Sequence, residues 1–252
     1  MTVTVISQSM YFPWIGLFDQ IRLADEFIFY DDVQLTRGFY NRVQVIQANG
    51  TKFITVPLAK KKQKQLIQDT KISQNGCWHA SHKSKLEESF SAAPYNQEAL
   101  KVFDKVMAKN DKNLAELNKN SIMEIAKNLS LENSTSFKSS SEMLATGTSS
   151  ERLLDLCKKS GCDIYLTGHG ALNYLDHNLF ERNAIEVFYI KYEFTPYETS
   201  ARDYTPYVTC LDAIAHLGAK TVETMKSTMV HWSDAILNPK SLRPFSDTSQ
   251  ID

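Results

Sequence analysis

Short apolar runs and amphipathic segments alternate over the first 35 residues of the chain. Residues 3–7 (VTVIS) are apolar and β-branched, which is typical of a buried strand. Residues 16–25 repeat apolar side chains at helical spacing, and residues 26–35 (EFIFYDDVQL) predict a second strand. Strand, helix and strand in this order predict a parallel βαβ unit.

The same alternation returns in the second half of the chain. Residues 163–167 (DIYLT) and 184–192 (AIEVFYIKY) predict two strands separated by a helix. The helix before them begins at a capping-box pattern, with Thr148 at the N-cap and Glu151 three residues later, and it ends at Gly161. A second βαβ unit is therefore expected.

Between the two units the pattern changes twice. Alternating runs on both sides of ANG predict a β-hairpin within residues 40–58, and residues 82–130 carry apolar side chains at helical spacing. We therefore expect an α/β fold with a Rossmann-like, mainly parallel sheet, a helical insertion at 82–130 and a small hairpin. A single domain is expected over residues 1–245, followed by a disordered tail at 246–252.

Composition narrows the functional classes. Of the 252 residues, 42% are hydrophobic, and the net charge of −1 gives no overall field that attracts DNA or a membrane surface. No apolar run approaches the roughly 18 residues that span a bilayer. Four scattered cysteines and an N-terminus without a signal-peptide pattern predict a cytoplasmic protein with reduced thiols.

Candidate chemistry begins in the loop after the first predicted strand, YFPWIG. Phe12, Pro13 and Gly16 are similar to the F-x-P-x-H-x-G-H loop of Rossmann-like nucleotidyltransferases, but the two histidines that hold the phosphate there are absent. Adenylyl transfer is therefore disfavoured. Tyr11 and Trp14 have two interpretations: they stack on a base or sugar ring, or they only fill the end of the sheet.

Polar residues follow the second predicted strand. Asp31 and Asp32 are adjacent, so in a strand only one of them faces a site at the strand end. Arg37, Asn41 and Arg42 come next, and a guanidinium can hold a phosphate through two parallel hydrogen bonds. The alternative interpretation is a turn with surface charges.

A third cluster, GHGALNYLD, follows the predicted strand DIYLT. Gly168 and Gly170 flank His169 and permit close approach of the backbone to a ligand. His169 is the best candidate for a general base, because an imidazole titrates near neutrality; the alternative is a loop histidine bonded to backbone. Tyr174 and Asp176 lie about one turn further on.

A metal site is a further alternative. The C-x-H-x-x-H spacing of Cys77, His79 and His82 offers three metal ligands, but no fourth ligand is evident. The sequence contains no Walker loop, no G-x-S-x-G and no C-x-x-C motif, and no stripe of basic and aromatic residues that indicates nucleic-acid binding. No metal or cofactor is firmly implied.

Taken together, these clusters resemble the WbqC-like family. The resemblance rests on SQSMYFPWIGLFDQIRLADEFIFYDDVQLTRGFYNR and KFITVPL, and it continues in YLTGHGALNYLD, FERNAIEVFYIKYEFTPY and CLDAIAHLG. It covers most of residues 5–220, and it adds Gln8 to the candidate substrate-binding residues.

The resemblance implies a bacterial cytoplasmic protein of surface-polysaccharide (O-antigen) biosynthesis. The implied reaction is transfer of an acyl or aminoacyl group to the amine of a nucleotide-linked amino sugar. The expected partners are that nucleotide sugar, an activated acyl donor, free or bound to a carrier, and a second copy of the chain in a homodimer. DNA binding and membrane insertion are not expected. A nucleotidyltransferase-like enzyme and a non-catalytic nucleotide-sugar-binding or assembly protein stay open as alternatives.

For this reaction we expect His169 and one of Asp31 and Asp32 to act as the base. Backbone N–H groups of residues 168–171 are expected to hold an oxyanion or a diphosphate. The expected substrate-binding set is Gln8, Tyr11, Trp14, Arg37, Asn41, Arg42, Gly168, Gly170, Tyr174 and Asp176.

Overall fold

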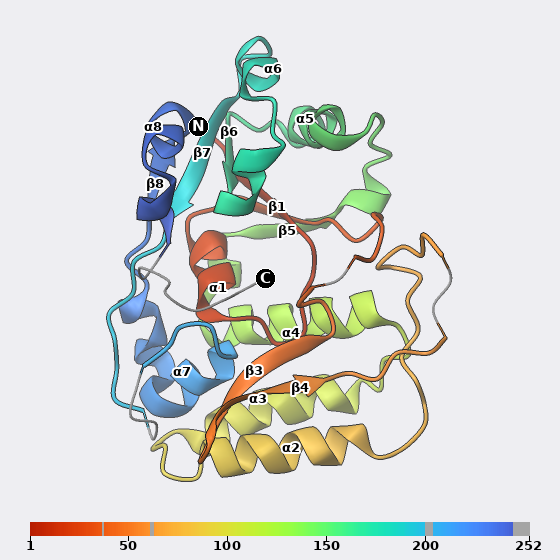
Figure 1. Cartoon of the computed structure of the whole chain (residues 1–252), viewed down its shortest axis with the longest axis vertical. Helices are drawn as coiled ribbons and strands as arrows, with labels where there is room; N and C mark the ends of the chain where they lie inside the picture. The colour runs from red at the N-terminus through yellow and green to blue at the C-terminus, as the bar shows by residue number, and fades with distance from the viewer. Residues whose placement is uncertain (37, 61–62, 200–203, 244–252) are drawn as a thin grey trace.

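A six-stranded sheet occupies the upper half of the molecule (Figure 1). The computed structural model describes residues 1–36, 38–60, 63–199 and 204–243. The strands run in the order β5-β2-β1-β6-β7-β8, and each neighbouring pair is parallel except β7 and β8. Their bounds are β1 (Val3–Ser7), β2 (Glu26–Phe29), β5 (Ser136–Ser139), β6 (Ile164–Thr167), β7 (Glu186–Lys191) and β8 (Thr228–His231). The predicted α/β class with a mainly parallel sheet is confirmed.

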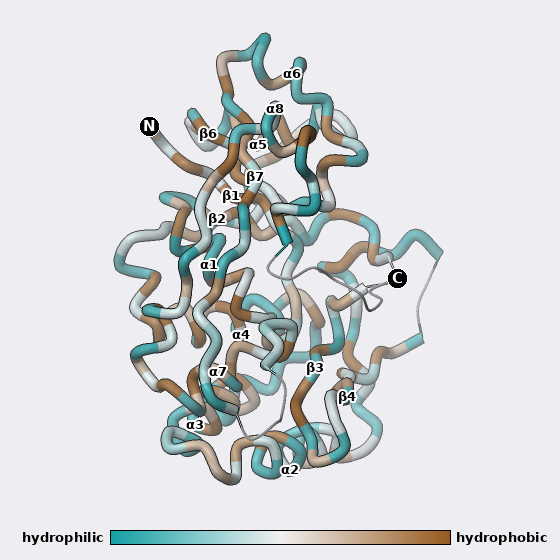
Figure 2. The backbone as a smooth tube through the Cα atoms, turned by 60° about the vertical axis from the view of Figure 1, so that its left-hand side comes forward, coloured by the Kyte–Doolittle hydropathy of each residue, from teal (hydrophilic) through white to brown (hydrophobic). Residues whose placement is uncertain are grey.

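Both faces of this sheet are covered. Along β1, Val5 packs into one hydrophobic core and Ile6 into the other, and Phe27 and Ile28 of β2 divide in the same way. Successive side chains of a strand point to opposite faces, so continuous apolar runs are what a doubly covered sheet requires. Figure 2 shows hydrophobic residues gathered along the interior and hydrophilic residues on the outer segments such as α6.

The two hydrophobic cores contain residues of different helices. The larger core contains residues of α1 (Ile15–Arg22), α2 (Trp78–Ser89), α3 (Asn96–Ala108), α4 (Leu114–Asn128) and α7 (Cys210–Leu217). The smaller core contains residues of α5 (Ser149–Ser160), α6 (His177–Glu181) and α8 (Trp232–Leu237). Short 3₁₀ segments are η1 (Leu131–Asn133), η2 (Ser140–Glu142), η3 (His169–Asn173), η4 (Gly218–Thr224) and η5 (Pro239–Leu242).

The segment between the βαβ units has the two predicted parts. The helical insertion expected at 82–130 corresponds to α2, α3 and α4. The hairpin consists of β3 (Arg42–Gln47) and β4 (Gly50–Thr55), which pair in antiparallel register, and Gly50 adopts a φ of +97° at the turn. The hairpin lies over α2 in the lower half of the molecule (Figure 1).

The second strand was predicted too long. β2 ends at Phe29 rather than at residue 35, although Tyr30 N–H still donates to the carbonyl of Ser7 at 2.9 Å. Asp31 then turns its carboxylate back to accept from the backbone N–H of Ser9 at 2.9 Å. This bond ties the loop after β2 to the loop after β1, so the chain leaves the sheet there.

The helix after residue 148 begins and ends where expected, but its capping box does not form. Thr148 is the N-cap residue of α5, yet its side chain makes no capping hydrogen bond. The next residue, Ser149, has a φ of +48°, which departs from regular helical entry. Gly161 ends the helix in the left-handed conformation at φ +72°, as predicted.

The C-terminal part contains elements that the sequence pattern did not indicate, β8 and α8. The tail predicted at 246–252 lies outside the described residues. In the described part of the chain, no helix combines the length and the apolar character needed to cross a membrane.

Candidate functional site

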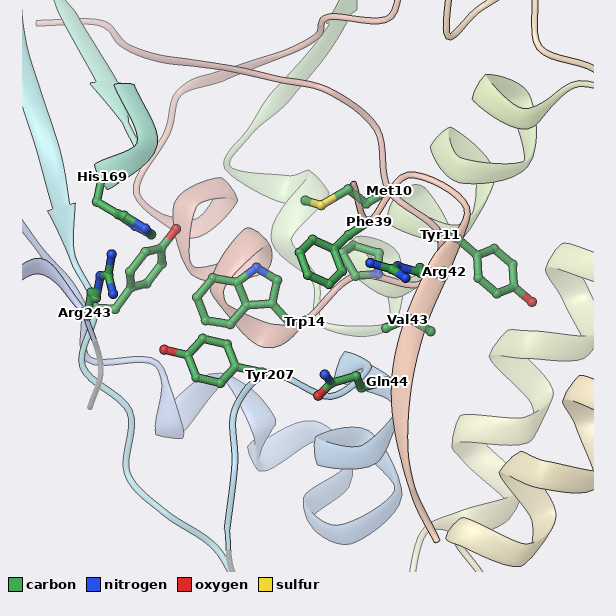
Figure 3. Close-up of a pocket in the computed structure, with 12 residues that line it drawn as sticks. Met10, Tyr11, Trp14, Phe39, Arg42, Val43, Gln44, His169, Tyr207 and Arg243 are labelled. Carbon is green, nitrogen blue, oxygen red and sulfur yellow. The ribbon is translucent and has the colours of Figure 1, made fainter. Parts of the chain in front are cut away.

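A cavity of about 310 Å³ lies beside the loops that follow β1, β6 and β7. This is the edge at which parallel sheets present ligand sites. Its walls come from six parts of the sequence: the loop before α1, the start of β3 with the residue Phe39 before it, the loop after β6, the residue after β7, the segment before α7 and the residue after η5 (Figure 3). The lining residues are Met10, Tyr11, Pro13, Trp14, Phe39, Arg42, Val43, Gln44, His169, Tyr192, Tyr207 and Arg243.

Trp14 forms an aromatic floor between the two ends of this cavity (Figure 3). Its ring centroid lies 4.8 Å from that of Tyr192 and 5.4 Å from that of Tyr207. The indole folds over Gly16, where a Cβ would lie only 2.3 Å from a ring carbon. Glycine at position 16 is therefore what allows Trp14 to lie in this position.

Tyr11 and Phe12 of the same loop belong to the core. The Tyr11 side chain is fully buried, and its hydroxyl is 2.9 Å from Nδ1 of His82. Burial raises the pKa of Tyr11 and lowers the pKa of His82 to about 4. Phe12, also buried, has a φ of +40°, and its N–H donates to Oγ of Ser121. In the YFPWIG loop, therefore, Tyr11 and Phe12 fill the core, and Trp14 faces the cavity.

Positively charged groups lie at both ends of the cavity (Figure 3). Arg42 lies at one end, where its guanidinium is 4.5 Å from the ring centroid of Phe53 and 5.4 Å from that of Phe39. Arg243 and His169 lie at the other end. The lining contains no aspartate or glutamate among the described residues, so the electrostatic environment favours an anionic ligand.

His169 stands at the start of η3, directly after Gly168 at the end of β6. Desolvation by the surrounding protein and, to a lesser degree, the positive charge of Arg243 lower the pKa of His169 below its usual value. The imidazole is therefore neutral at pH 7 and can accept a proton. Of the three groups expected to act as a base, His169 is the one that lines the cavity.

The two adjacent aspartates lie outside the cavity lining and hold loops. Asp31 is buried, and burial raises its pKa, while its Oδ1 accepts from Ser9 N–H. Asp32 accepts from Arg152 and from Oγ of Ser140, each at 2.5 Å. Its charge is thus already neutralised by a partner in the fold.

The remaining predicted residues divide into three groups. Arg42 and Trp14 reach the cavity, whereas the Asn41 amide donates to the carbonyl of Val56 at 2.8 Å within the hairpin region. Gln8 accepts from the Tyr40 hydroxyl at 2.7 Å next to this region. Arg37 lies outside the described residues.

The GHGALNYLD cluster is only partly assembled around the cavity. Asp176 caps α6 by accepting from the N–H of Leu179 at 3.0 Å, and Tyr174 is 57% exposed. Gly168 lies close to Gln20 and Tyr192, as a Cβ built on it would be 3.7 Å from the amide nitrogen and 4.0 Å from the hydroxyl. Gly170 faces open space.

Arg243, Tyr192 and Tyr207 line the cavity without having been predicted from the sequence. Arg243 reaches it because the preceding residue, Leu242, is fully buried and its carbonyl accepts from Tyr192 N–H at 3.1 Å. A lone arginine near the C-terminal end carries no local signal of such a position. The aromatic run FYIKYEF, which begins within β7 and extends past its end, was the only hint of Tyr192.

The metal alternative gains no support. Cys77 is exposed, the His79 ring packs against Trp78 in a tilted arrangement, and His82 contacts Tyr11. Across the described ranges, no three histidine, cysteine or acidic side chains come together as metal ligands.

Comparison with known proteins identifies the family. A model of the WbqC-like protein family matches residues 8–224, which includes most of the cavity lining. The chain is also 31% identical over 230 residues to uncharacterized protein Rv1507c of Mycobacterium tuberculosis, covering 90% of this chain and 98% of that protein. No solved structure matches the chain. The family match extends over most of the length that the sequence resemblance covered, and the chain belongs to the WbqC-like protein family.

Proposed function

We propose that this protein transfers an acyl or aminoacyl group to the amine of a nucleotide-linked amino sugar in surface-polysaccharide (O-antigen) biosynthesis. The observation that carries the proposal is the composition of the cavity. It combines the aromatic floor formed by Trp14, an arginine at each end, and His169, which has a lowered pKa and lies just after a parallel strand. Each of these matches one part of a nucleotide sugar or one step of acyl transfer.

The cations and Trp14 are suited to the nucleotide. Arg42 and Arg243 make no ion pair with the described residues, and Nε of Arg42 is buried without a partner. Their donors are therefore available to phosphate oxygens, which a guanidinium holds through parallel hydrogen bonds. The Trp14 indole offers a face on which a base or sugar ring stacks.

His169 is suited to the transfer step. As the sugar amine forms a bond to the acyl carbon, the bond to the leaving group breaks and the nitrogen becomes cationic. The neutral imidazole of His169 accepts the proton that this nitrogen must lose. Asp31 and Asp32 are not assigned this role, because neither lines the cavity and Asp32 is paired with Arg152.

Ligand binding tests the first half of the proposal. Uridine-, thymidine- and guanosine-diphosphate sugars are screened by thermal shift, because a ligand at 100 times its Kd stabilises the fold by about 2.7 kcal/mol. Arg42→Ala is expected to weaken binding about 10- to 100-fold, since it removes hydrogen bonds to a charged group. Arg182→Ala, an exposed arginine at the end of α6, is the matched control. If no nucleotide sugar binds, the proposal fails.

Turnover tests the second half. With a binding nucleotide sugar and acyl donors, the product is detected as a mass increase on the sugar amine. His169→Ala is expected to lower the rate about 10²–10⁴-fold with a smaller effect on substrate binding. In a separate assay with a nucleoside triphosphate and a sugar phosphate, release of diphosphate as the nucleotide sugar forms would instead indicate nucleotidyl transfer. Binding without turnover for every donor class would indicate a non-catalytic binding protein.

A further inference from the structure

A buried pair of polar side chains, Gln20 and Tyr192, lies behind one end of the cavity. Gln20 projects from α1 and is 9% exposed, and Tyr192 follows β7 and is 6% exposed. The amide nitrogen of Gln20 donates a hydrogen bond to the Tyr192 hydroxyl. Tyr192 lines the cavity and packs against the Trp14 floor.

This bond determines where the Tyr192 proton can go. The hydroxyl oxygen accepts from Gln20, so its own hydrogen is left for a second partner. Among the described residues, that hydrogen has no acceptor. The hydroxyl adjoins the backbone at Gly168, where a Cβ would be 4.0 Å away, and Gly168 directly precedes His169. Burial also raises the pKa of Tyr192, so the group stays protonated and neutral.

We propose that Tyr192 donates a hydrogen bond to an anionic oxygen of the ligand, at the end of the cavity formed by His169 and Arg243, and that Gln20 positions this donor. The ligand group is a phosphate or diphosphate, because a neutral donor beside a guanidinium suits an oxygen that already carries charge. The identification of this group rests on the proposed function.

Inorganic diphosphate is the probe, since it presents the anionic oxygens without a base or sugar. Its binding is measured by isothermal titration calorimetry on the full chain. Tyr192→Phe keeps the ring and removes only the hydroxyl, and it is expected to raise the Kd about 10- to 100-fold. Tyr95→Phe, at a half-exposed tyrosine outside the cavity lining, is the matched control and is expected to leave the Kd unchanged.

Gln20→Glu tests the positioning role. A carboxylate at this position accepts the Tyr192 proton and turns the donor away from the cavity, so diphosphate binding falls. The negative charge also repels the ligand, and the double variant Gln20→Glu/Tyr192→Phe separates the two effects. If Gln20 acts through Tyr192, the substitution weakens binding less in the Tyr192→Phe background than in the parent. Equal weakening in both backgrounds overturns the positioning role.

The outcomes also separate this inference from the proposed function. Diphosphate binding that depends on Tyr192, with no nucleotide sugar bound, supports the inference and contradicts the proposed function. Nucleotide-sugar binding, together with an unchanged diphosphate Kd in Tyr192→Phe, supports the proposed function and contradicts the role of Tyr192. A parent protein that does not bind diphosphate at all overturns the inference.

Discussion

Replacing Gly16 by alanine should change the shape of the cavity while changing the unfolding free energy of the protein only a little. A Cβ at position 16 would lie 2.3, 2.4 and 2.6 Å from three carbons of the Trp14 ring, which is far inside ordinary van der Waals contact. The indole must therefore move. Its other ring neighbours are Tyr192, Tyr207 and Phe194, and the cavity offers the open space, so the movement carries the indole into the cavity.

Two opposing effects set the magnitude. Overpacking of this kind costs about 1–3 kcal/mol, whereas alanine is better than glycine inside a helix by up to about 1 kcal/mol. The net change in the parent is consequently small and uninformative by itself. In a Trp14→Ala background the clash is absent, and Gly16→Ala should stabilise the protein. The coupling between the two sites then isolates the clash at about 1–3 kcal/mol.

The assay is urea unfolding of the four proteins of this cycle, followed by circular dichroism. Gly170→Ala is the control, because a Cβ there meets nothing within 4 Å, and it should change the unfolding free energy by less than about 0.5 kcal/mol. Gly16→Ala should also weaken binding of any ligand found for the cavity. A coupling energy near zero, with ligand binding intact, would refute the conclusion that glycine is needed beneath Trp14.

Three further predictions concern polar side chains that stabilise the fold outside the cavity lining. Lowering the pH from about 6.5 to about 4 should reduce the unfolding free energy by up to about 3 kcal/mol through His82. The pKa of His82 is about 4 in the folded protein, so the unfolded chain binds the proton first as the pH falls. A His82→Gln variant should lose this part of the pH dependence, measured by urea unfolding at each pH. Arg152→Ala should lower the unfolding free energy by about 1–3 kcal/mol, because the Asp32 carboxylate then keeps only its hydrogen bond from Ser140. Lys83→Ala, which breaks an exposed ion pair with Asp104, should lower it by less than about 1 kcal/mol. Equal losses for the two variants in chemical denaturation would contradict this reasoning. Asp176→Ala should lower the unfolding free energy by about 1 kcal/mol, because it removes a helix cap. Thr148→Ala should lower it by a few tenths of a kcal/mol at most, because the Thr148 side chain makes no capping hydrogen bond. Thermal unfolding of both variants measures this ranking, and the opposite order would contradict it.

The sequence predicted the sheet well because its strands are apolar on both faces. Val5 and Ile6 of β1, for example, enter different cores, and only a doubly covered strand calls for such a run. The edge strand β8 lacks this signal, since its residues are exposed or only half-buried. Periodicity thus identifies the centre of the sheet better than its edge.

The site was harder to predict, because residue type does not reveal which loop residues turn inward. Asp32 and Asp176 have the chemistry of site residues, but one is paired with Arg152 and the other caps α6. Arg243 lines the cavity only because Leu242 is anchored beneath β7. Long-range contacts of this kind leave no pattern in the local sequence.

The cavity joins the loop before α1 to the residues after η5, which are among the first and last described segments of the chain. A bound ligand would therefore act as a non-covalent cross-link between remote parts of the sequence. Such a closure is costly to form early in folding, so the binding site should be completed only after the sheet and hairpin have assembled. Occupancy would then slow exchange of backbone amide hydrogens in both segments together, rather than only in the loop that touches the ligand.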